Sequence, residues 1–426
     1  MLPTTTNTGL QKTTSYKVVL PFYIFAAVSF LLSCILLLLN TGVVHQHYFH
    51  PQTLAITHLM ALGWGTMIIL GASHQLLPML IEGKLSSDLL GYLSFIFTAI
   101  GIPFLVVGFY IFHVGWVLQT GAVLVNTGVV FYLVNVISSI FESKKYDVYA
   151  WFIATASLWL FATTFFGLLL VFNFTRAWLP GNSIDYLSLH AHMGLAGWFL
   201  LLIIGVASRL IPMFLISKYT NTKTLWWIFA LINTALAGFI LLKTFDSLPQ
   251  FYYTPFLLVL IALLMFGNFC FKAYKVRIRK KVDEQMKVSL LSVALLLLPL
   301  LSLLVVIYFL SATLRSNMVL LYGFCIFFGW ITAIILGMTF KTLPFIVWNK
   351  VYHNRALGKT PTPKELFSGQ VFKIMSILYL CGFVLFIAGI ISLNDLLLKS
   401  GAASLFSAAI FYVCNVAKII LHQPQK

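Results

Sequence analysis

The chain has 426 residues, of which 61% are hydrophobic and 9% are charged, and its formal net charge is +17. A soluble domain carries about a quarter charged residues, so this composition excludes an ordinary soluble protein and indicates an integral membrane protein. The positive charge does not predict nucleic-acid binding, because the lysines and arginines gather in the loops between apolar segments.

Apolar segments of roughly 20 residues, each long enough to cross a hydrocarbon layer about 30 Å thick, recur along the whole chain. Twelve are predicted, at 18–40, 53–80, 89–111, 115–140, 149–173, 186–214, 224–243, 252–272, 288–312, 317–347, 370–393 and 400–420. The first follows a threonine-rich stretch without a small-residue cleavage site, which is typical of a retained helix and not of a signal peptide. We therefore expect an all-α integral membrane protein with twelve transmembrane helices, in a single membrane domain over residues 1–426.

Lysine and arginine alternate between loops as the positive-inside rule predicts. One set of loops holds most of them, including the cluster from Lys272 to Lys287, whereas the opposite set holds only Arg176, Lys243, Arg315 and Lys399. This distribution predicts cytoplasmic termini, in a bacterial inner membrane. It also predicts that the basic cluster contacts anionic membrane lipids, with no nucleic acid as a partner.

Three of the predicted helices carry the same pattern, and they are spans two, six and ten. Each copy has a glycine followed by tryptophan, a second glycine eight residues after the first, and a proline fifteen residues after it. The copies are Gly63, Trp64, Gly71 and Pro78; Gly197, Trp198, Gly205 and Pro212; and Gly329, Trp330, Gly337 and Pro344. An internal repeat of this kind determines architecture. We expect three four-helix repeats, over approximately 18–140, 149–272 and 288–420, in a pseudo-threefold arrangement.

The residue five positions before the first glycine is His58, His192 and Phe324 in the three copies. Ionisable side chains inside a membrane are costly and are candidates for function, and neutral imidazole is a common ligand of haem iron and copper. His58 and His192 would either hold one haem from both sides, or one would hold haem and the other copper. The structural alternative is that each only hydrogen-bonds a carbonyl within the bundle.

Other polar residues are weaker candidates for the same site. His190 precedes His192 by two residues and so points to nearly the opposite face of the helix, as a further metal ligand, a propionate partner or a helix-end residue. Arg176 and Arg315 would pair with haem propionates or remain solvated in loops. His45, His47 and His50 form a short run that suits copper or zinc only weakly. The five cysteines, Cys34, Cys270, Cys325, Cys381 and Cys414, are expected to be buried and inert, without a disulfide or a zinc site.

The threefold repetition of four-helix units resembles subunit I of the haem–copper oxidase superfamily. The pattern His-x4-Gly-aromatic-x6-Gly-x6-Pro is most similar to the NnrS-type relatives, which are twelve-span haem- and copper-containing membrane proteins linked to nitric oxide. The resemblance implies a haem, most simply of b type, and copper as a second metal. It also implies a redox partner or oxidase subunits, and a small gaseous substrate.

The resemblance is incomplete on two helices. Phe324 stands at the repeat position on the tenth span, and neither that span nor the seventh contains a histidine. Conventional oxygen reduction is therefore not expected, and whether the chain is an enzyme stays open. The expected function is haem binding, with copper as an option, through His58 and His192 in redox chemistry or nitric oxide response. The alternatives are a cofactor-free transporter or scaffold, and a haem or copper carrier for oxidase assembly.

Overall fold

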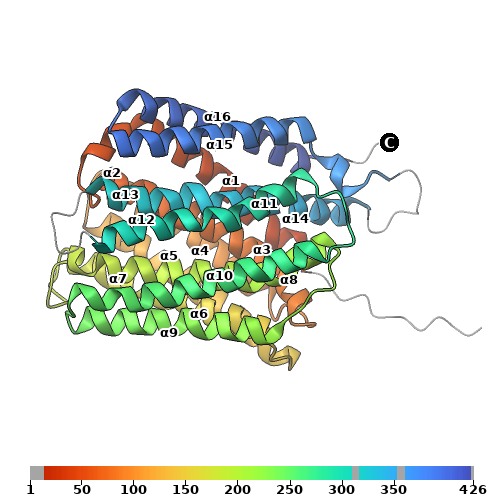
Figure 1. Cartoon of the computed structure of the whole chain (residues 1–426), viewed down its shortest axis with the longest axis horizontal. Helices are drawn as coiled ribbons and strands as arrows, with labels where there is room; N and C mark the ends of the chain where they lie inside the picture. Colours follow the sequence, from red (N-terminus) through yellow and green to blue (C-terminus); the bar gives the residue numbers. More distant parts are fainter. Residues whose placement is uncertain (1–13, 309–315, 353–359, 424–426) are drawn as a thin grey trace, which may run out of the picture.

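The computed structural model describes residues 14–308, 316–352 and 360–423, and in these ranges the chain is built of helices. Twelve helical segments are long and apolar enough to cross a membrane, and they run roughly parallel to the long axis of the molecule (Figure 1). Apart from one isolated bridge between Ser217 and Arg277, the described residues form no β-structure. The prediction of an all-α protein with twelve transmembrane helices is confirmed.

The helices follow one another in three groups of four spans. The first group is α1 (Tyr16–Leu39), α2 (Pro51–His58) continued by η2 (Leu59–Thr66) and α3 (Met67–Leu80), α4 (Asp88–Tyr110) and α5 (Trp116–Ser143). The second is α6 (Val148–Asn173), α7 (Leu187–His192) continued by η4 (Met193–Leu200) and α8 (Leu201–Leu215), α9 (Thr222–Thr244) and α10 (Tyr253–Lys275). The third is α11 (Glu284–Leu295) with α12 (Leu297–Tyr308), α13 (Ser316–Phe324) continued by η7 (Cys325–Ile331) and α14 (Thr332–Tyr352), α15 (Gly369–Ser392) and α16 (Asp395–Ile420).

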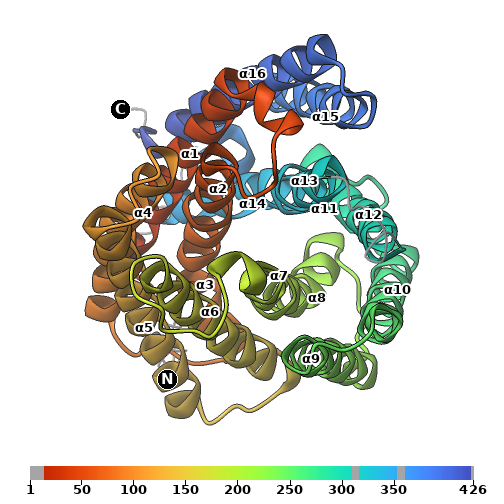
Figure 2. The same cartoon turned by 90° about the vertical axis from the view of Figure 1, so that its left-hand side faces the viewer.

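The three spans that carry the repeated pattern form the centre of the bundle. Their most apolar windows are 72%, 72% and 67% buried, whereas no other span exceeds 50%. Figure 2 shows α2–α3, α7–α8 and α13–α14 toward the middle, with the remaining helices around them. The lipid-facing surface is therefore supplied mainly by the other nine spans, and the repeated pattern lies where helices contact helices.

The second glycine of each copy contacts the first helix of its own group. A Cβ atom added to Gly71 would lie 2.7 Å from the Cβ of Phe22 on α1, and one added to Gly205 would lie 2.5 Å from the Cβ of Phe152 on α6. At Gly337 it would meet Ser289 on α11. Small residues allow membrane helices to approach this closely. The three groups thus use one glycine position for one kind of helix contact.

Buried hydrogen bonds connect the patterned helices to one another. The indole Nε1 of Trp198 donates to Oγ1 of Thr66, and that of Trp64 donates to Oγ1 of Thr332, each over 3.0 Å. Both threonines stand three residues after the first glycine of their copy, where the second copy has Leu200. The tryptophan of the second copy therefore binds the first copy, and that of the first binds the third. Leu200 offers Trp330 no acceptor for the same bond.

A narrow cavity of about 100 Å³, the central cavity, runs between the three patterned helices. Its lining contains the residues 5, 6, 9, 10 and 13 positions after the first glycine of every copy. These are Ile68, Ile69, Ala72, Ser73 and Leu76; Leu202, Ile203, Val206, Ala207 and Leu210; and Ile334, Ile335, Met338, Thr339 and Thr342. Equivalent faces of the three helices thus line one cavity.

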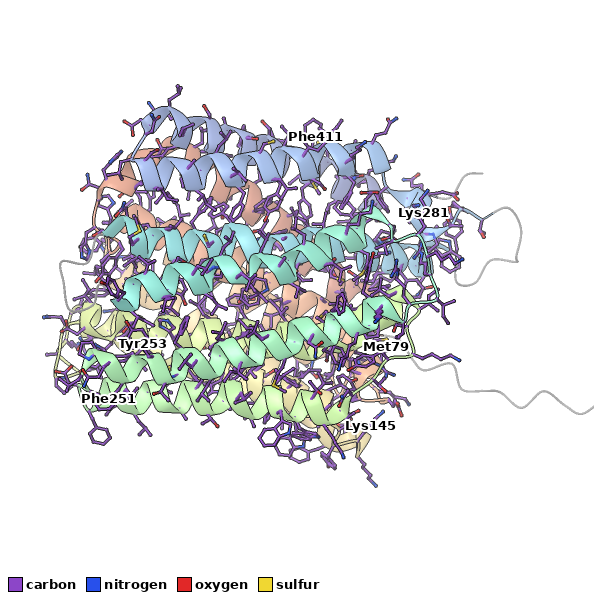
Figure 3. The ribbon with its side chains drawn as sticks, viewed as in Figure 1. Met79, Lys145, Phe251, Tyr253, Lys281 and Phe411 are labelled. Carbon is purple, nitrogen blue, oxygen red and sulfur yellow. The ribbon has the colours of Figure 1, made fainter. Side chains whose placement is uncertain are left out.

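The two ends of the bundle differ in charge. Lys145 and Lys281 lie at one end of the molecule and Phe251 at the other (Figure 3). The short helices α2 and α7, which end at His58 and His192, lie toward the end where Phe251 is found (Figure 1). The histidines of the repeated pattern are therefore near the lysine-poor end.

Candidate functional site

Each patterned helix widens into a π-helical segment at the same place. These segments are η2, η4 and η7, and they begin immediately after His58, His192 and Phe324. A π-helical turn is rare, and within α-helices it is frequent at functional sites. The widened turn thus places the residue before it at a break in the regular hydrogen-bond ladder, in all three copies.

Both repeat histidines are held in the same tautomer. The Nδ1 atom of His58 lies 2.8 Å from the carbonyl oxygen of Leu54, and that of His192 lies 2.7 Å from that of Ser188. A carbonyl oxygen only accepts, so Nδ1–H donates in both cases and the neutral ring keeps its lone pair on Nε2. Metal-binding histidines are usually oriented by such a bond from the other ring nitrogen.

The structure does not bring His58 and His192 together. They line different cavities, and the histidine nearest to His58 in this arrangement is His190, which joins it in one cavity. The ring centroids of His58 and His190 are 6.4 Å apart, and their planes differ by 23°. The pair that shares a site is therefore His58 and His190, and His192 belongs to the next interface.

The same repeat positions build both cavities. His58 and Thr66 of the first copy face His190 and Trp198 of the second. In the next interface, the equivalent positions are His192 and Leu200 of the second copy, which face Tyr322 and Trp330 of the third. The rings of His192 and Tyr322 are 6.0 Å apart with planes 21° apart, almost the geometry of the histidine pair. The two cavities are thus related by the repeat.

The third interface has lost its polar pair. Phe324 of the third copy occupies the position of His58 and His192, and Ile56 of the first copy occupies that of His190 and Tyr322. Phe324 stacks on Phe386 with ring centroids 4.5 Å apart and on Phe328 at 4.9 Å. A cavity of about 570 Å³ lies at this interface, but its two repeat positions, Ile56 and Phe324, are apolar and offer no ligand atom.

The cavity around His58, called the His58 cavity, holds about 190 Å³. Phe109 stacks on His58 with ring centroids 4.5 Å apart, and Nδ1 of His190 is buried without a hydrogen-bond partner among the described residues. A Cβ atom at Gly167 would lie 2.8 Å from Cε1 of His190, so only glycine leaves room for this ring. The two imidazoles therefore meet in an apolar space with an unsatisfied nitrogen.

The spacing of the two rings suits a shared metal. A metal–imidazole bond is about 2.0–2.1 Å long and a ring nitrogen lies roughly 1 Å from its ring centre, so two imidazoles on opposite sides of one metal have centres about 6–6.5 Å apart. The 6.4 Å between the centroids of His58 and His190 falls in this range. The distance between the two rings is therefore compatible with one metal held by two nitrogens.

The cavity around His192, called the His192 cavity, is larger and holds about 560 Å³. The hydroxyl of Tyr322 donates a long hydrogen bond of 3.4 Å to Nε2 of His192. Phe239 of α9 lies 4.7 Å from the imidazole between ring centroids. Lys243 and Asp246 line the same cavity at the end of α9. It combines one imidazole, the phenols of Tyr322 and Tyr252, and extensive apolar walls.

The remaining predicted ligands that the structure describes line neither cavity. Arg176 is exposed in the loop after α6, and Arg315 lies outside the described residues. His45 binds Asp395 over 2.8 Å, while Nδ1 of His47 accepts from the backbone N–H of Phe49. Within the described ranges, no three histidine, cysteine, aspartate or glutamate side chains gather as a metal site. The first-loop histidines are thus not assembled around a metal.

Two predicted details need correction. Cys34, Cys270 and Cys325 are buried as expected, but Cys381 and Cys414 are exposed. They are exposed because α15 and α16 turn part of their surface outward, away from the core, and the sequence gives no sign of which face of an apolar helix does so. None of the five forms a disulfide.

An ion pair holds the lysine-rich end of the third group. The carboxylate of Asp283 caps α11 by accepting from the N–H of Met286 over 3.1 Å, and it binds Lys341 of α14 and Arg279. Burial by itself raises the pKa of Asp283, but the hydrogen bond and charge of Lys341 lower it more, so the pKa lies below the ordinary 3.8. This pair joins the first helix of the group to its patterned helix.

We expect Asp283→Asn to destabilise the protein by about 1.5–3 kcal/mol, the range for hydrogen bonds to charged groups. Asparagine caps a helix as well as aspartate does, so the loss reports the ion pair alone. A lowered folded pKa means that the contribution is complete above about pH 3.8 and disappears as the pH falls through the folded pKa. Thermal unfolding in detergent at neutral and acid pH measures this, and equal melting temperatures at pH 7 would refute it.

A scan of known protein families finds no model that matches this chain, and a search of curated proteins finds no similar protein.

Proposed function

We propose that this chain is an integral membrane protein that binds a redox-active metal, as haem iron or as copper, between His58 and His190. The observation that carries the proposal is the pair of imidazoles 6.4 Å apart, with a lone pair on Nε2 of His58 and an unpartnered, buried Nδ1 on His190. Imidazole nitrogen suits both iron and copper. His192, expected from the sequence to share this site, has its own cavity and is assigned below to another ligand.

The His58 cavity suits a copper ion better than it suits a haem. The donor atoms suit either one, but the 190 Å³ of the His58 cavity is below the roughly 300–1,000 Å³ of sites that enclose a small molecule. A copper ion fits the space between the rings as it stands, whereas a b-type haem requires the surrounding apolar side chains to move apart. When bound, the metal would supply one-electron chemistry or bind a small gas such as nitric oxide. The chain supplies two nitrogens and walls that exclude water.

The proposal includes the architecture and orientation implied by the repeats. We place three four-helix units around a pseudo-threefold axis through the central cavity, in an arrangement resembling oxidase subunit I and the NnrS-type proteins. The shared lining positions and the parallel glycine contacts support this placement. The gathering of lysine at one end supports cytoplasmic termini in a bacterial inner membrane, with the metal near the external face. A redox partner or oxidase subunits would then exchange electrons from that side.

The test is an absorption and metal analysis of detergent-purified protein from cells grown with ample haem and copper. A reduced-minus-oxidised haem spectrum, or one copper per chain by elemental analysis, supports the proposal and decides between the two metals. Protein that folds and contains neither metal would overturn it.

A second candidate is a transporter without a resident cofactor. The His192 cavity favours it, since a space of about 560 Å³ with charged residues at its mouth suits passage or binding of a small molecule. A carrier of haem or copper for oxidase assembly would differ from both in containing labile metal at less than one per chain.

A further inference from the structure

The His192 cavity differs from the His58 cavity at the positions that define the metal site. Tyr322 replaces the second imidazole, and Leu200 replaces the threonine that binds a tryptophan in the other interface. The cavity has about 560 Å³, against about 190 Å³ around His58. We propose that the His192 cavity binds a membrane amphiphile with a neutral phenol or hydroquinone head, whose hydroxyl donates to His192 and whose apolar chain leaves between α10 and α12.

The head of this ligand is selected by the direction of hydrogen bonding at His192. Nδ1–H of His192 donates to the carbonyl of Ser188, so Nε2 is an acceptor, and its donor in this structure is the hydroxyl of Tyr322 over a long 3.4 Å. A phenolic hydroxyl can donate to Nε2, whereas an ionised carboxylate only accepts and is repelled by the lone pair of Nε2. A ligand hydroxyl would replace the hydroxyl of Tyr322 on Nε2, and the Tyr322 hydroxyl would then donate to the oxygen of the ligand. Phe239 and Trp330 add flat walls that suit an aromatic ring.

The mouth of the cavity does not favour an anion. Lys243 lies there, but Asp246 lies there as well, so the two formal charges cancel. An anionic head such as a carboxylate thus finds one cation and one anion instead of a basic patch. A neutral head is the better match to this pair and to the acceptor on His192.

A wall of apolar side chains separates the His192 cavity from the lipid-facing surface. Leu263 of α10 and Leu296 and Leu300 beside and within α12 line both the His192 cavity and an outer groove of about 460 Å³. The outer groove is lined also by Leu264 and Leu297, which are 57% and 50% exposed. A chain attached to a head at His192 therefore reaches the lipid when these leucine side chains move aside.

The wall between the His192 cavity and the outer groove coincides with a break in the ninth span. Leu296 separates α11 from α12, and Pro299 follows in the first turn of α12. Proline lacks an N–H and its ring clashes with the carbonyl four residues earlier, so it interrupts a helix at this distance. Both Leu296 and Pro299 line the His192 cavity. The interruption thus forms part of the wall through which the chain would pass.

The experiment measures binding of radiolabelled para-dodecylphenol to the purified protein in nanodiscs, with empty nanodiscs as the background. Its methyl ether, para-dodecylanisole, has the same ring and chain but no donor, and dodecanoate has a carboxylate head. We expect the phenol to bind about two- to tenfold more tightly than the ether, which is the value of one hydrogen bond. We expect dodecanoate to compete more weakly than the phenol.

Two variants assign the effect to this cavity. His192→Phe places in the second copy the residue that the third copy carries at Phe324, and it should lower the affinity for the phenol to that for the ether. Tyr322→Phe keeps the ring and removes the second hydroxyl, and it should weaken phenol binding by a smaller factor. Equal affinity for phenol and ether, tighter binding of dodecanoate, or phenol binding unchanged in His192→Phe would overturn the proposal. Phenol binding is measured on metal-free protein, so its outcome does not depend on whether a metal binds between His58 and His190.

Discussion

Protein carrying His58→Ala or His190→Ala is expected to purify without the metal that we propose to lie between these two rings. Each substitution removes one of two nitrogens, and the other imidazole alone cannot hold the metal in an apolar cavity from both sides. Loss of a residue that only orients a ligand costs ten- to a hundredfold in metal affinity, so loss of a ligand should cost more than about a hundredfold. Metal content per chain and the reduced-minus-oxidised spectrum measure the effect.

His192→Ala is the matched control, because the sequence places His192 at the repeat position of His58 whereas the structure places it in the neighbouring cavity. Its Nδ1–H makes the same bond to a carbonyl four residues earlier, so a general loss of helix geometry would affect both variants alike. We expect His192→Ala to retain the metal. A variant set in which His192→Ala loses the metal and His190→Ala keeps it would restore the pairing of His58 with His192 and refute the one proposed here.

The spans could be predicted because length and apolar composition determine them. The second span was expected at 53–80 and is found at Pro51–Leu80, and the sixth was expected at 186–214 and is found at Ser183–Leu215. The tenth was expected at 317–347 and is found at Ser316–Tyr352. The helix continues past the apolar run through Asn349 and Lys350, so apolar composition marks the membrane-spanning part and not the end of the helix.

The site could be predicted only in part. The repeat identifies His58 and His192 as equivalent positions, and this equivalence is found in their tautomers and in the π-helical turns that follow them. What the repeat does not determine is how adjacent copies contact each other. In both cavities, the residue five positions before the first glycine of one copy, His58 or His192, faces the residue seven positions before the first glycine of the next copy. That second residue is His190 or Tyr322. That offset depends on the rotation of each helix in the bundle, and no spacing within one helix contains it.

The pseudo-threefold arrangement stays a prediction that the packing supports. A sequence repeat by itself is compatible with groups that lie in a row or around an axis. Lining of the central cavity by the same five positions of each copy favours an axis. The hydrogen bonds from Trp198 to Thr66 and from Trp64 to Thr332 favour it too, since they follow one direction around that axis.

Gly337→Ala is expected to destabilise the protein by about 1–3 kcal/mol, the usual cost of inserting an extra carbon into a tightly packed contact. The added Cβ would lie 2.7 Å from the carbonyl oxygen of Gln285 and 2.8 Å from the backbone nitrogen of Ser289. These are main-chain atoms of α11, so relief requires the whole helix to move and not only a side chain. Thermal unfolding in detergent measures the loss.

Gly323→Ala, in the same span, is the control and is expected to act in the opposite direction. Nothing lies within 4 Å of a Cβ atom at Gly323, which is near the end of α13, where the helix continues into η7. Alanine there restricts the unfolded chain and raises stability by about 0.4–1 kcal/mol. Opposite signs for the two substitutions would show that the glycines of the repeat are there for helix approach. Equal shifts would mean instead that Gly337 acts through backbone freedom alone, and the close contact between the first helix of the group and its patterned helix would lose its support.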